Sequence, residues 1–200
     1  MAQWEQIRRQ AALVGQVKDA QTGQPLPGVR VTISAAPAEF TSWLAIRARQ
    51  DGALWAALEE RPDRMLTRAD GRFHFLDLPN GQYTLTASLP SRDSRYGAAQ
   101  AQATVSRSGG RIALAAVNLA LPPTAIKGQI TGRNGAPVML AEVRIKGGAL
   151  RTFSDDKGAY LLTAVQAGPQ TVVVSAQGYA PKEIAIDSQA SLVQTLNIAL

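Results

Sequence analysis

The sequence predicts an all-β chain of two tandem antiparallel Greek-key β-sandwiches, the first with a short α-helical insertion. Three observations lead to this prediction: one pattern occurs twice, each copy consists of short β-branched or alternating runs, and turn residues separate the runs. With 200 residues, two small domains can each bury a modest core. An apolar content of 46% and a charged content of 18% are ordinary for folded domains.

The repeat can be followed through corresponding segments in the two halves of the chain. Three pairs of segments match, at the start, middle and end of each copy: Val14-Gly15-Gln16-Val17 with Lys127-Gly128-Gln129-Ile130, Asp70-Gly71-Arg72-Phe73 with Asp156-Lys157-Gly158-Ala159-Tyr160, and Val117-Asn118-Leu119-Ala120-Leu121 with Leu196-Asn197-Ile198-Ala199-Leu200. Gly15 and Gly128 are 113 positions apart, whereas Phe73 and Tyr160 are 87 apart. Since 113 − 87 = 26, the first copy contains 26 extra residues between its second strand and the Asp-Gly turn.

Each copy has the signature of short antiparallel strands. Runs such as 29–33, 83–87 and 171–174 are β-branched or alternate between apolar and polar residues. Asp70-Gly71 and Asn80-Gly81 suit the tight turns between strands, because glycine accepts a positive φ. In alternating runs one face enters the core, so Phe73, Phe75, Tyr83 and Tyr160 are expected to be buried.

These features divide the chain into four segments. We expect an N-terminal arm over 1–12, a first module over 13–121 with its insertion at 36–66, a linker over 122–125 and a second module over 126–200. Pro122 and Pro123 suit a short, stiff linker because two successive prolines favour extended backbone.

The motifs of the first copy read G-x-V, G-x-P-L-x-G-V-x-V, T-x-x-D-G-x-F and L-P-x-G-x-Y-x-L, and the second copy adds Ala176-Gln177-Gly178-Tyr179. This pattern resembles the carboxypeptidase regulatory-like family, a transthyretin- or prealbumin-like sandwich related to Cna-B-type modules. The resemblance covers nearly the whole chain and implies the fold. It says little about activity, because the motifs consist of turn and core residues.

Residues 36–66 depart from the β pattern. Apolar residues recur there at helical spacing, and Asp51-Gly52 divides the stretch into two short helices: Phe40, Trp43, Leu44, Ala48, Leu54, Trp55 and Leu58. Two readings are compatible with each other. The stripe can bury against its own sandwich, or part of it can dock on another protein, where tryptophan is a frequent hot spot.

Trp4 and Ile7, with Ala11, lie at helical spacing before the first strand. This N-terminal arm is either a frayed terminus or a segment that packs on a neighbouring subunit. The candidate protein-interaction residues are therefore Phe40, Trp43, Leu44, Trp55, Leu58, Trp4 and Ile7.

The residues that catalytic and metal sites require are nearly absent. The chain has no cysteine and one histidine, His74, which we expect on the surface. This composition gives no support to a zinc site, a Ser-His-Asp triad or a Cys-His pair, so we expect no enzyme activity, metal or cofactor. Asp155-Asp156-Lys157-Gly158 reads as an ordinary turn and not as a calcium loop.

The Cna-B resemblance raises one covalent alternative, a Lys–Asn isopeptide bond. Asn118 and Asn197 lie in the final strands and Lys127 lies near a first strand, but the position that matches Lys127 in the first copy is Val14. We expect the asparagines to bond to backbone instead.

The net charge of +6 suggests nucleic-acid binding, but basic and acidic residues are interleaved and lack the clustering and stacking aromatics of a nucleic-acid groove. No apolar run reaches the ~20 residues that span a bilayer. The polar start lacks the apolar core of a signal peptide. These features favour neither nucleic-acid binding nor membrane insertion. They predict a cytoplasmic location or a place within a cytoplasmically built assembly.

The function that these observations favour is a non-enzymatic structural or adaptor protein in a larger assembly. Its partners would be other protein subunits, and a homo-oligomer stays open. Modules that resemble these occur as accessories in phage-tail-like contractile injection machines. Removal of 38–63 is expected to abolish partner capture and leave a folded β protein. The alternative is a carbohydrate- or peptide-binding module, for which Tyr96 and Tyr179 are the weak aromatic candidates.

Overall fold

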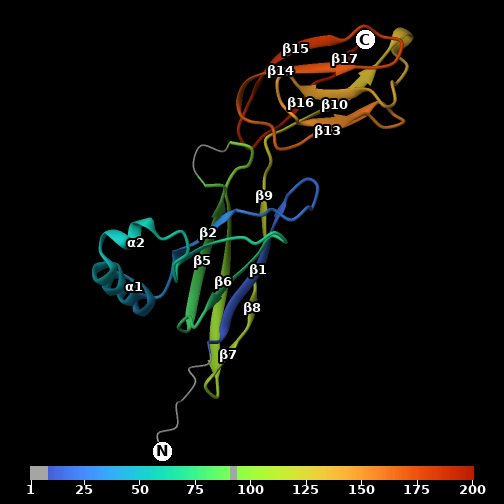
Figure 1. Ribbon diagram of the computed structural model, residues 1–200. Coiled ribbons are helices and arrows are strands. Elements are labelled where there is room, and N and C mark those ends of the chain that lie inside the picture. Colours follow the sequence, from blue (N-terminus) through green and yellow to red (C-terminus); the bar gives the residue numbers. More distant parts are fainter. Residues whose placement is uncertain (1–8, 91–93) are drawn as a thin grey trace, which may run out of the picture. The chain divides into compact units, whose positions relative to one another are not determined.

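The computed structural model describes residues 9–90 and 94–200, and the chain divides into two compact units. The first unit comprises Met1–Pro90 and Ala98–Leu121, and the second comprises Ser91–Gly97 and Pro122–Leu200. Both units consist of β-sheets, and the two α-helices of the described residues belong to the first (Figure 1). The predicted all-β fold with a short helical insertion is confirmed.

The first unit contains two sheets, ordered β4-β1-β8 with β9 also on β1, and β3-β2-β5-β6-β7. Its strands are β1 (Ala11–Asp19), β2 (Arg30–Ala35), β3 (Arg64–Leu66), β4 (Arg72–Leu76), β5 (Gly81–Ser88), β6 (Ala99–Ser108), β7 (Arg111–Ala113), β8 (Ala115–Ala116) and β9 (Leu119–Leu121). The insertion leaves the sheet after β2 and returns at β3, and it contains α1 (Ala38–Asp51) and α2 (Ala53–Ala57).

The second unit repeats this plan without the helices. Its sheets are ordered β13-β10-β16, with β17 also on β10, and β12-β11-β14-β15. Its elements are β10 (Ala125–Thr131), the 3-10 turn η1 (Arg133–Gly135), β11 (Glu142–Ile145), β12 (Arg151–Phe153), β13 (Ala159–Leu162), β14 (Gly168–Ser175), β15 (Lys182–Ser188), β16 (Val193–Thr195) and β17 (Ile198–Ala199).

The core of each unit is built from the alternate residues that both of its sheets contribute. The four aromatic residues predicted to be internal are all buried: Phe73, Phe75, Tyr83 and Tyr160. In the second unit Tyr160 lies in a cluster with Ile126, Val143 and Val172, which come from both sheets. Burial raises the pKa of Tyr83 to about 12 and also raises the pKa of Tyr160, because the apolar surroundings disfavour the phenolate.

The pairing of the first and last strands differs from the antiparallel prediction. β1 runs parallel to β9, with Val17 opposite Leu119, and β10 runs parallel to β17, with Ile130 opposite Ile198. The hairpins are antiparallel as expected. The final strand reaches the sheet of the first strand by a crossover from the other sheet, and not by a tight turn. A tight turn would make it antiparallel to its neighbour, whereas a crossover allows parallel pairing, so local turn signals do not predict its direction.

An asparagine in each copy joins the last strand segment to the first. The Oδ1 atom of Asn118 accepts the backbone N–H of Gln16 at 3.1 Å, and that of Asn197 accepts Gln129 at 3.0 Å. Lys127 is exposed. The side chains of Asn118 and Asn197 thus hydrogen-bond to the backbone, as expected.

A buried hydroxyl fixes the corresponding turn in each copy. Thr67 Oγ1 accepts the Val29 N–H at 2.9 Å and donates to the Leu26 carbonyl at 2.7 Å. Ser154 Oγ accepts the Ala141 N–H at 2.9 Å and donates to the Val138 carbonyl at 2.6 Å. This repeated arrangement ties the turn before the second strand to the segment after the third.

Removing either hydroxyl is expected to leave a buried N–H without a partner. Thr67→Val and Ser154→Ala should each lower the free energy of unfolding of their own unit by about 1–3 kcal/mol, measured by urea denaturation. Thr41→Ala is the control, because Thr41 Oγ1 makes only an exposed hydrogen bond to Ala38. Equal midpoints for Ser154→Ala and Thr41→Ala would contradict the role of the buried hydroxyl.

Residues 94–97, between β5 and β6, belong by their contacts to the second unit. The Gly97 N–H donates to the Pro122 carbonyl at 2.8 Å, and Thr124 Oγ1 donates to the Ser94 carbonyl at 2.6 Å. Ser94 Oγ also accepts the Ala167 N–H. The boundaries drawn from the sequence placed this segment in the first module, because reading the chain in linear order does not reveal a loop that pairs with residues 122–124.

Candidate protein-docking surface

The insertion is attached to the first sandwich by Phe40 near the start of α1. Phe40 is 4% exposed, and its ring meets that of Tyr83 edge-on with 6.0 Å between centroids. On the outer side it contacts Trp43 at 5.9 Å between centroids. Since Phe40 is the only buried residue of α1, this aromatic contact is the main apolar attachment of the helix.

A second attachment holds α2 and the chain that follows it. The Arg61 guanidinium lies over the Trp55 ring at 4.9 Å from its centroid and pairs with Asp63 at 3.0 Å. The Asp63 carbonyl accepts the Ile33 N–H of β2 at 2.8 Å, which links this group to the sheet. A cation over a tryptophan face that is also paired with a carboxylate fixes the orientation of both side chains.

Arg64 adds a further connection. Its guanidinium donates to the carbonyls of Leu58 and Glu59 after α2. Burial, followed by the neighbouring charges of Arg61 and Arg30, lowers the pKa of Arg64. The last turn of the insertion is therefore held by cationic side chains that hydrogen-bond backbone and carboxylate oxygens.

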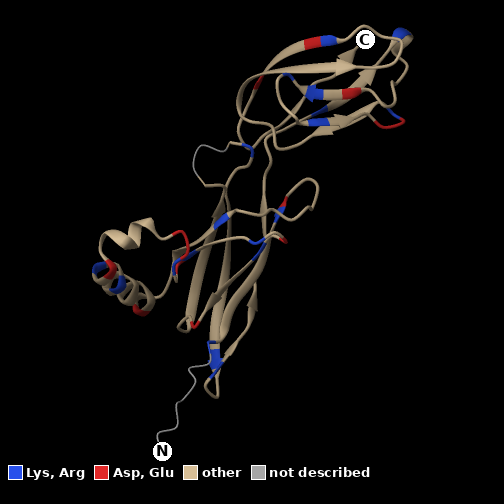
Figure 2. Cartoon of the chain, viewed as in Figure 1, with Lys and Arg blue, Asp and Glu red and all other residues tan. Residues whose placement is uncertain are grey.

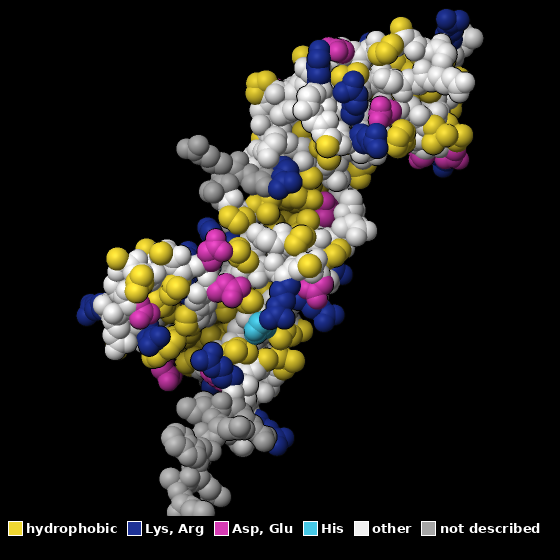
Figure 3. All heavy atoms as spheres, in the orientation of Figure 1, with side chains coloured by type: hydrophobic (Ala, Val, Ile, Leu, Met, Phe, Trp, Pro, Cys, Tyr) yellow, Lys and Arg dark blue, Asp and Glu magenta, His cyan; other side chains and the backbone are white. Residues whose placement is uncertain are grey.

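With its anchors turned inward, the insertion presents apolar side chains to solvent. Leu54 is 72% exposed, and three further large apolar residues of the insertion are also exposed: Trp43, Ile46 and Leu58. Figure 3 shows yellow hydrophobic side chains over the helices of the insertion. We call Trp43, Ile46, Leu54 and Leu58 the insertion surface.

A groove of about 920 Å³ lies between the insertion and the neighbouring β3 and β4 strands. Apolar side chains of both elements line it, including Phe40, Trp43 and Met65. Charged and polar groups also line it: Arg9, Glu39, Arg47, Glu60, Arg61, Arg68, His74 and Asp77. The lining therefore combines apolar surface with interspersed charges of both signs.

The predicted interaction residues separate into anchors and exposed groups. Phe40 and Trp55 are anchors, Leu44 is half-buried, and Trp43 and Leu58 are exposed. Trp4 and Ile7 lie outside the described residues. Ile46 was not among the predicted interaction residues, and Leu54 was predicted only as part of the helical stripe. Helical spacing shows which residues align, but not which edge of the stripe meets the sandwich.

The single histidine and the Asp155 turn, which the sequence raised as possible metal sites, can also be placed in the structure. His74 is half-buried in β4, where it lines the groove, and its backbone N–H donates to the Met65 sulfur at 3.1 Å. Asp155 Oδ1 accepts the N–H groups of Lys157 and Ala159, as an ordinary turn requires. Among the described residues, no three His, Cys, Asp or Glu side chains lie close enough together to hold a metal ion.

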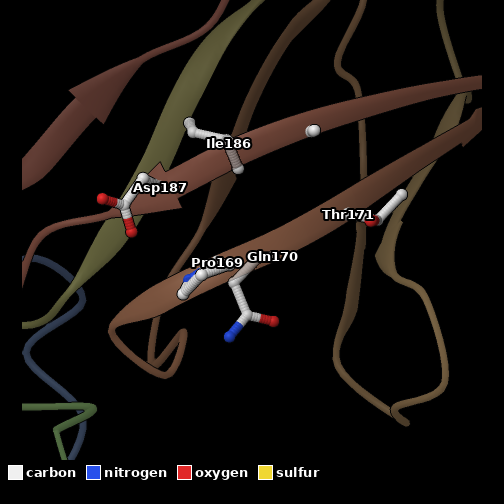
Figure 4. Close-up of a pocket in the computed structure, with 6 residues that line it drawn as sticks. Pro169, Gln170, Thr171, Ile186 and Asp187 are labelled. Carbon is white, nitrogen blue, oxygen red and sulfur yellow. The ribbon is translucent and has the colours of Figure 1, made fainter.

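The aromatic candidates for glycan stacking do not form an exposed platform. Tyr179 is half-buried, and its hydroxyl lies against Gly132, where a Cβ atom would be 2.1 Å away. Tyr96 is also half-buried and bridges to Pro123. A shallow groove of about 370 Å³ over β14 and β15 is lined by short or flexible side chains, among them Thr171, Ile186 and Asp187 (Figure 4).

Charges are interspersed along the described parts of both units (Figure 2). The ion pairs include Arg47–Asp51 at 3.9 Å within α1 and Lys146–Glu183 at 2.7 Å between distant parts of the second unit's sequence. None of the described helices is both long and apolar enough to cross a membrane.

The two sandwiches, which share one plan, match a single known domain family. The profile of the carboxypeptidase regulatory-like domain matches residues 12–114 and 125–200. The chain belongs to the carboxypeptidase regulatory-like domain family. It contains two copies of the domain, and the resemblance inferred from the turn and core motifs is confirmed.

No curated relative matches this carboxypeptidase regulatory-like protein. Among solved structures, the chain is similar to the Bacillus anthracis TIE protein, with a TM-score of 0.45 and 15% identity over 96% of this chain and 33% of that one. The shaft pilin SpaA from Lactobacillus rhamnosus GG gives a TM-score of 0.44 and 13% identity over 96% of this chain and 98% of that one.

One chain of a type II cohesin-X-dockerin complex from Acetivibrio cellulolyticus gives a TM-score of 0.34 and 22% identity over 38% of this chain and 56% of that one. The present chain thus spans less than two thirds of that chain and of the TIE protein. At these identities the likeness concerns the fold alone.

Proposed function

We propose that this protein is a non-enzymatic structural or adaptor component that holds another protein through its insertion surface. The observation that carries the proposal is an exposed apolar face on firmly anchored helices: Trp43, Ile46, Leu54 and Leu58. Contiguous exposed apolar side chains are typical of protein interaction sites, and tryptophan is enriched among the residues that dominate binding energy.

The proposal assigns the chain to a multi-protein assembly. Two sandwich domains in tandem provide a scaffold, and the extra 26 residues of the first copy give it a surface that the second copy lacks. The assembly we propose is a phage-tail-like contractile injection machine built in the cytoplasm, on the basis of the family resemblance. The family is known as a regulatory-like domain, and the proposal gives the chain no catalytic role and no role in binding nucleic acid.

Charge introduced on the insertion surface is expected to prevent partner capture without unfolding the protein. We expect the double variant Ile46→Asp/Leu54→Asp to reduce recovery of the partners of the tagged full-length chain, pulled down from its native host, by tenfold or more. A desolvated carboxylate is costly in an apolar interface, whereas both positions tolerate it in the free protein. Mass spectrometry would quantify the recovered proteins.

The matched control is Leu114→Asp, because Leu114 is an exposed leucine of the same unit outside the insertion. It should leave recovery unchanged. Equal recovery with all three proteins would exclude the insertion surface as the docking site. Point variants are a cleaner test than removal of 38–63, because Asp63 and Phe40 in that range contact the sandwich.

The groove beside α1 supports a second candidate function, the binding of an extended peptide. It combines an apolar lining with Arg47, Arg61 and Arg68. Ile46 and Leu54 do not line the groove, whereas Arg68 does. A partner that is lost with Arg68→Glu and kept with Ile46→Asp/Leu54→Asp would therefore identify peptide binding as the function.

A further inference from the structure

β12 is an open edge of the second unit. In the sheet β12-β11-β14-β15 it pairs with β11 only, with Glu142 opposite Phe153 and Arg144 opposite Arg151. The corresponding edge of the first unit is β3, and there the end of the insertion pairs with Arg64, the first residue of the strand. Arg61 and Arg64 exchange two backbone hydrogen bonds, of 2.6 and 3.0 Å. The second copy has no insertion to do the same.

The backbone N–H and C=O groups of Arg151 and Phe153 point away from β11, toward the open edge of the sheet. Ser154 directs both of its groups inward, since its N–H donates to the Ala141 carbonyl and its carbonyl accepts the Leu140 N–H. Groups on successive residues of a strand alternate between its two sides. Thr152 therefore faces β11, whereas Arg151 and Phe153 direct their N–H and C=O groups to the open edge.

Exposed apolar side chains surround this edge. Phe153 is 52% exposed and Leu140 66%, and Met139 beside Leu140 is also exposed. Leu140 has a φ of 58°, a left-handed conformation that disfavours L side chains. The matching residue of the first copy is Gly28, with a φ of 68° and the same hydrogen bond to the segment after the third strand. A leucine at this position is strained and gains no burial within its own chain.

The opposite edge of the same sheet is protected in the usual way. β15 carries three charged residues along its length: Lys182, Glu183 and Asp187. Charges on an edge strand oppose pairing with another chain. β12 carries a single charge, Arg151, which the carboxylate of Glu142 offsets at 3.4 Å. Of these two edges, only β12 combines outward backbone groups with apolar side chains and little net charge.

We propose that β12 pairs antiparallel with β12 of a second copy of this chain, about a two-fold axis at Thr152. In this register the Arg151 of each chain lies opposite the Phe153 of the other chain, which gives two equivalent pairs. Each pair can exchange two backbone hydrogen bonds. It also brings a guanidinium next to a phenyl ring on each side and avoids placing arginine opposite arginine. Met139 and Leu140 flank the paired strands, and the two-fold closes the assembly as a dimer.

Sedimentation velocity of the full-length chain, over a concentration series from micromolar to millimolar, tests this pairing. A three-residue edge forms a small interface, so we expect a weak dimer that grows with concentration. Phe153→Lys should keep the chain monomeric throughout the series, because it places a second cation opposite the partner's Arg151 and removes the phenyl ring. Leu140→Gly should weaken the dimer while the melting temperature of the monomer stays the same or rises, because glycine accepts the left-handed conformation.

Leu192→Lys is the matched control, since Leu192 is an exposed leucine of the same unit outside the β12 edge. It should dimerise like the unaltered chain. A sedimentation coefficient of the unaltered chain that does not change with concentration would overturn the proposal. Dimerisation of a folded Phe153→Lys variant at the level of the control would also overturn it. The assay needs no other partner, so its result is independent of the proposed adaptor function.

Discussion

Replacing Gly128 with alanine is expected to lower the free energy of unfolding of the second unit by about 3 kcal/mol or more, because the new methyl group has no room. A Cβ atom at Gly128 would lie 2.0 Å from the Leu196 carbonyl oxygen, in the chain segment that closes the sandwich. The atom in the way belongs to the backbone, so β10 and the final strands would have to separate. Gly15 has the same place in the first copy, with the Val117 oxygen at 1.8 Å.

Urea denaturation followed by circular dichroism measures this loss. Gly148→Ala is the control, because the nearest atom to its Cβ would be the Ile145 oxygen at 3.8 Å. That substitution should change stability by less than about 0.5 kcal/mol. If Gly128→Ala unfolded at the same urea concentration as Gly148→Ala, this would contradict the close approach of the chain around Leu196 to β10.

The second large effect is expected at Phe40. Removing its ring leaves a cavity over Tyr83, so Phe40→Ala should destabilise the attachment of α1 by about 3 kcal/mol. The sandwich has its own core, and its cooperative unfolding should survive. Trypsin should cleave the variant rapidly after Arg47 and Arg49 of α1, since a detached helix opens locally.

Trp43→Ala is the comparison for this variant, because Trp43 is a neighbouring aromatic residue that is 45% exposed, against 4% for Phe40. It should resist trypsin nearly as well as the unaltered chain. Equal cleavage rates for Phe40→Ala and the unaltered chain would show that another contact attaches the helix. Loss of the whole β signal in Phe40→Ala would show that the insertion is part of the sandwich core.

The features of the fold that depend on local signals could be predicted from the sequence. Asp70-Gly71 and Asn80-Gly81 mark turns that the structure contains, and the alternation around Phe73 and Phe75 identified buried residues. The parallel pairing of β1 with β9 could not be predicted, because it depends on a crossover between sheets. The pairing of residues 94–97 with residues 122–124 is a long-range contact that no local motif encodes.

The candidate site could be predicted only in part. Helical spacing located the stripe, but a stripe with two apolar edges does not reveal which edge is buried. Phe40 and Trp55 proved to be anchors, and Ile46 and Leu54 joined Trp43 on the exposed side. The contact of Phe40 with Tyr83 orients α1, and the stacking of Arg61 on Trp55 orients α2. Both are contacts with residues outside the helices, which periodicity does not describe.

Hydrogen–deuterium exchange of the full-length chain, with and without the partner recovered in the pull-down, tests the docking claim most directly. We expect the partner to slow exchange in peptides covering Ala38–Ala57 and to leave exchange in the second unit unchanged. Slower exchange in the second unit alone, or no change within Ala38–Ala57, would contradict the claim that the insertion surface holds the partner.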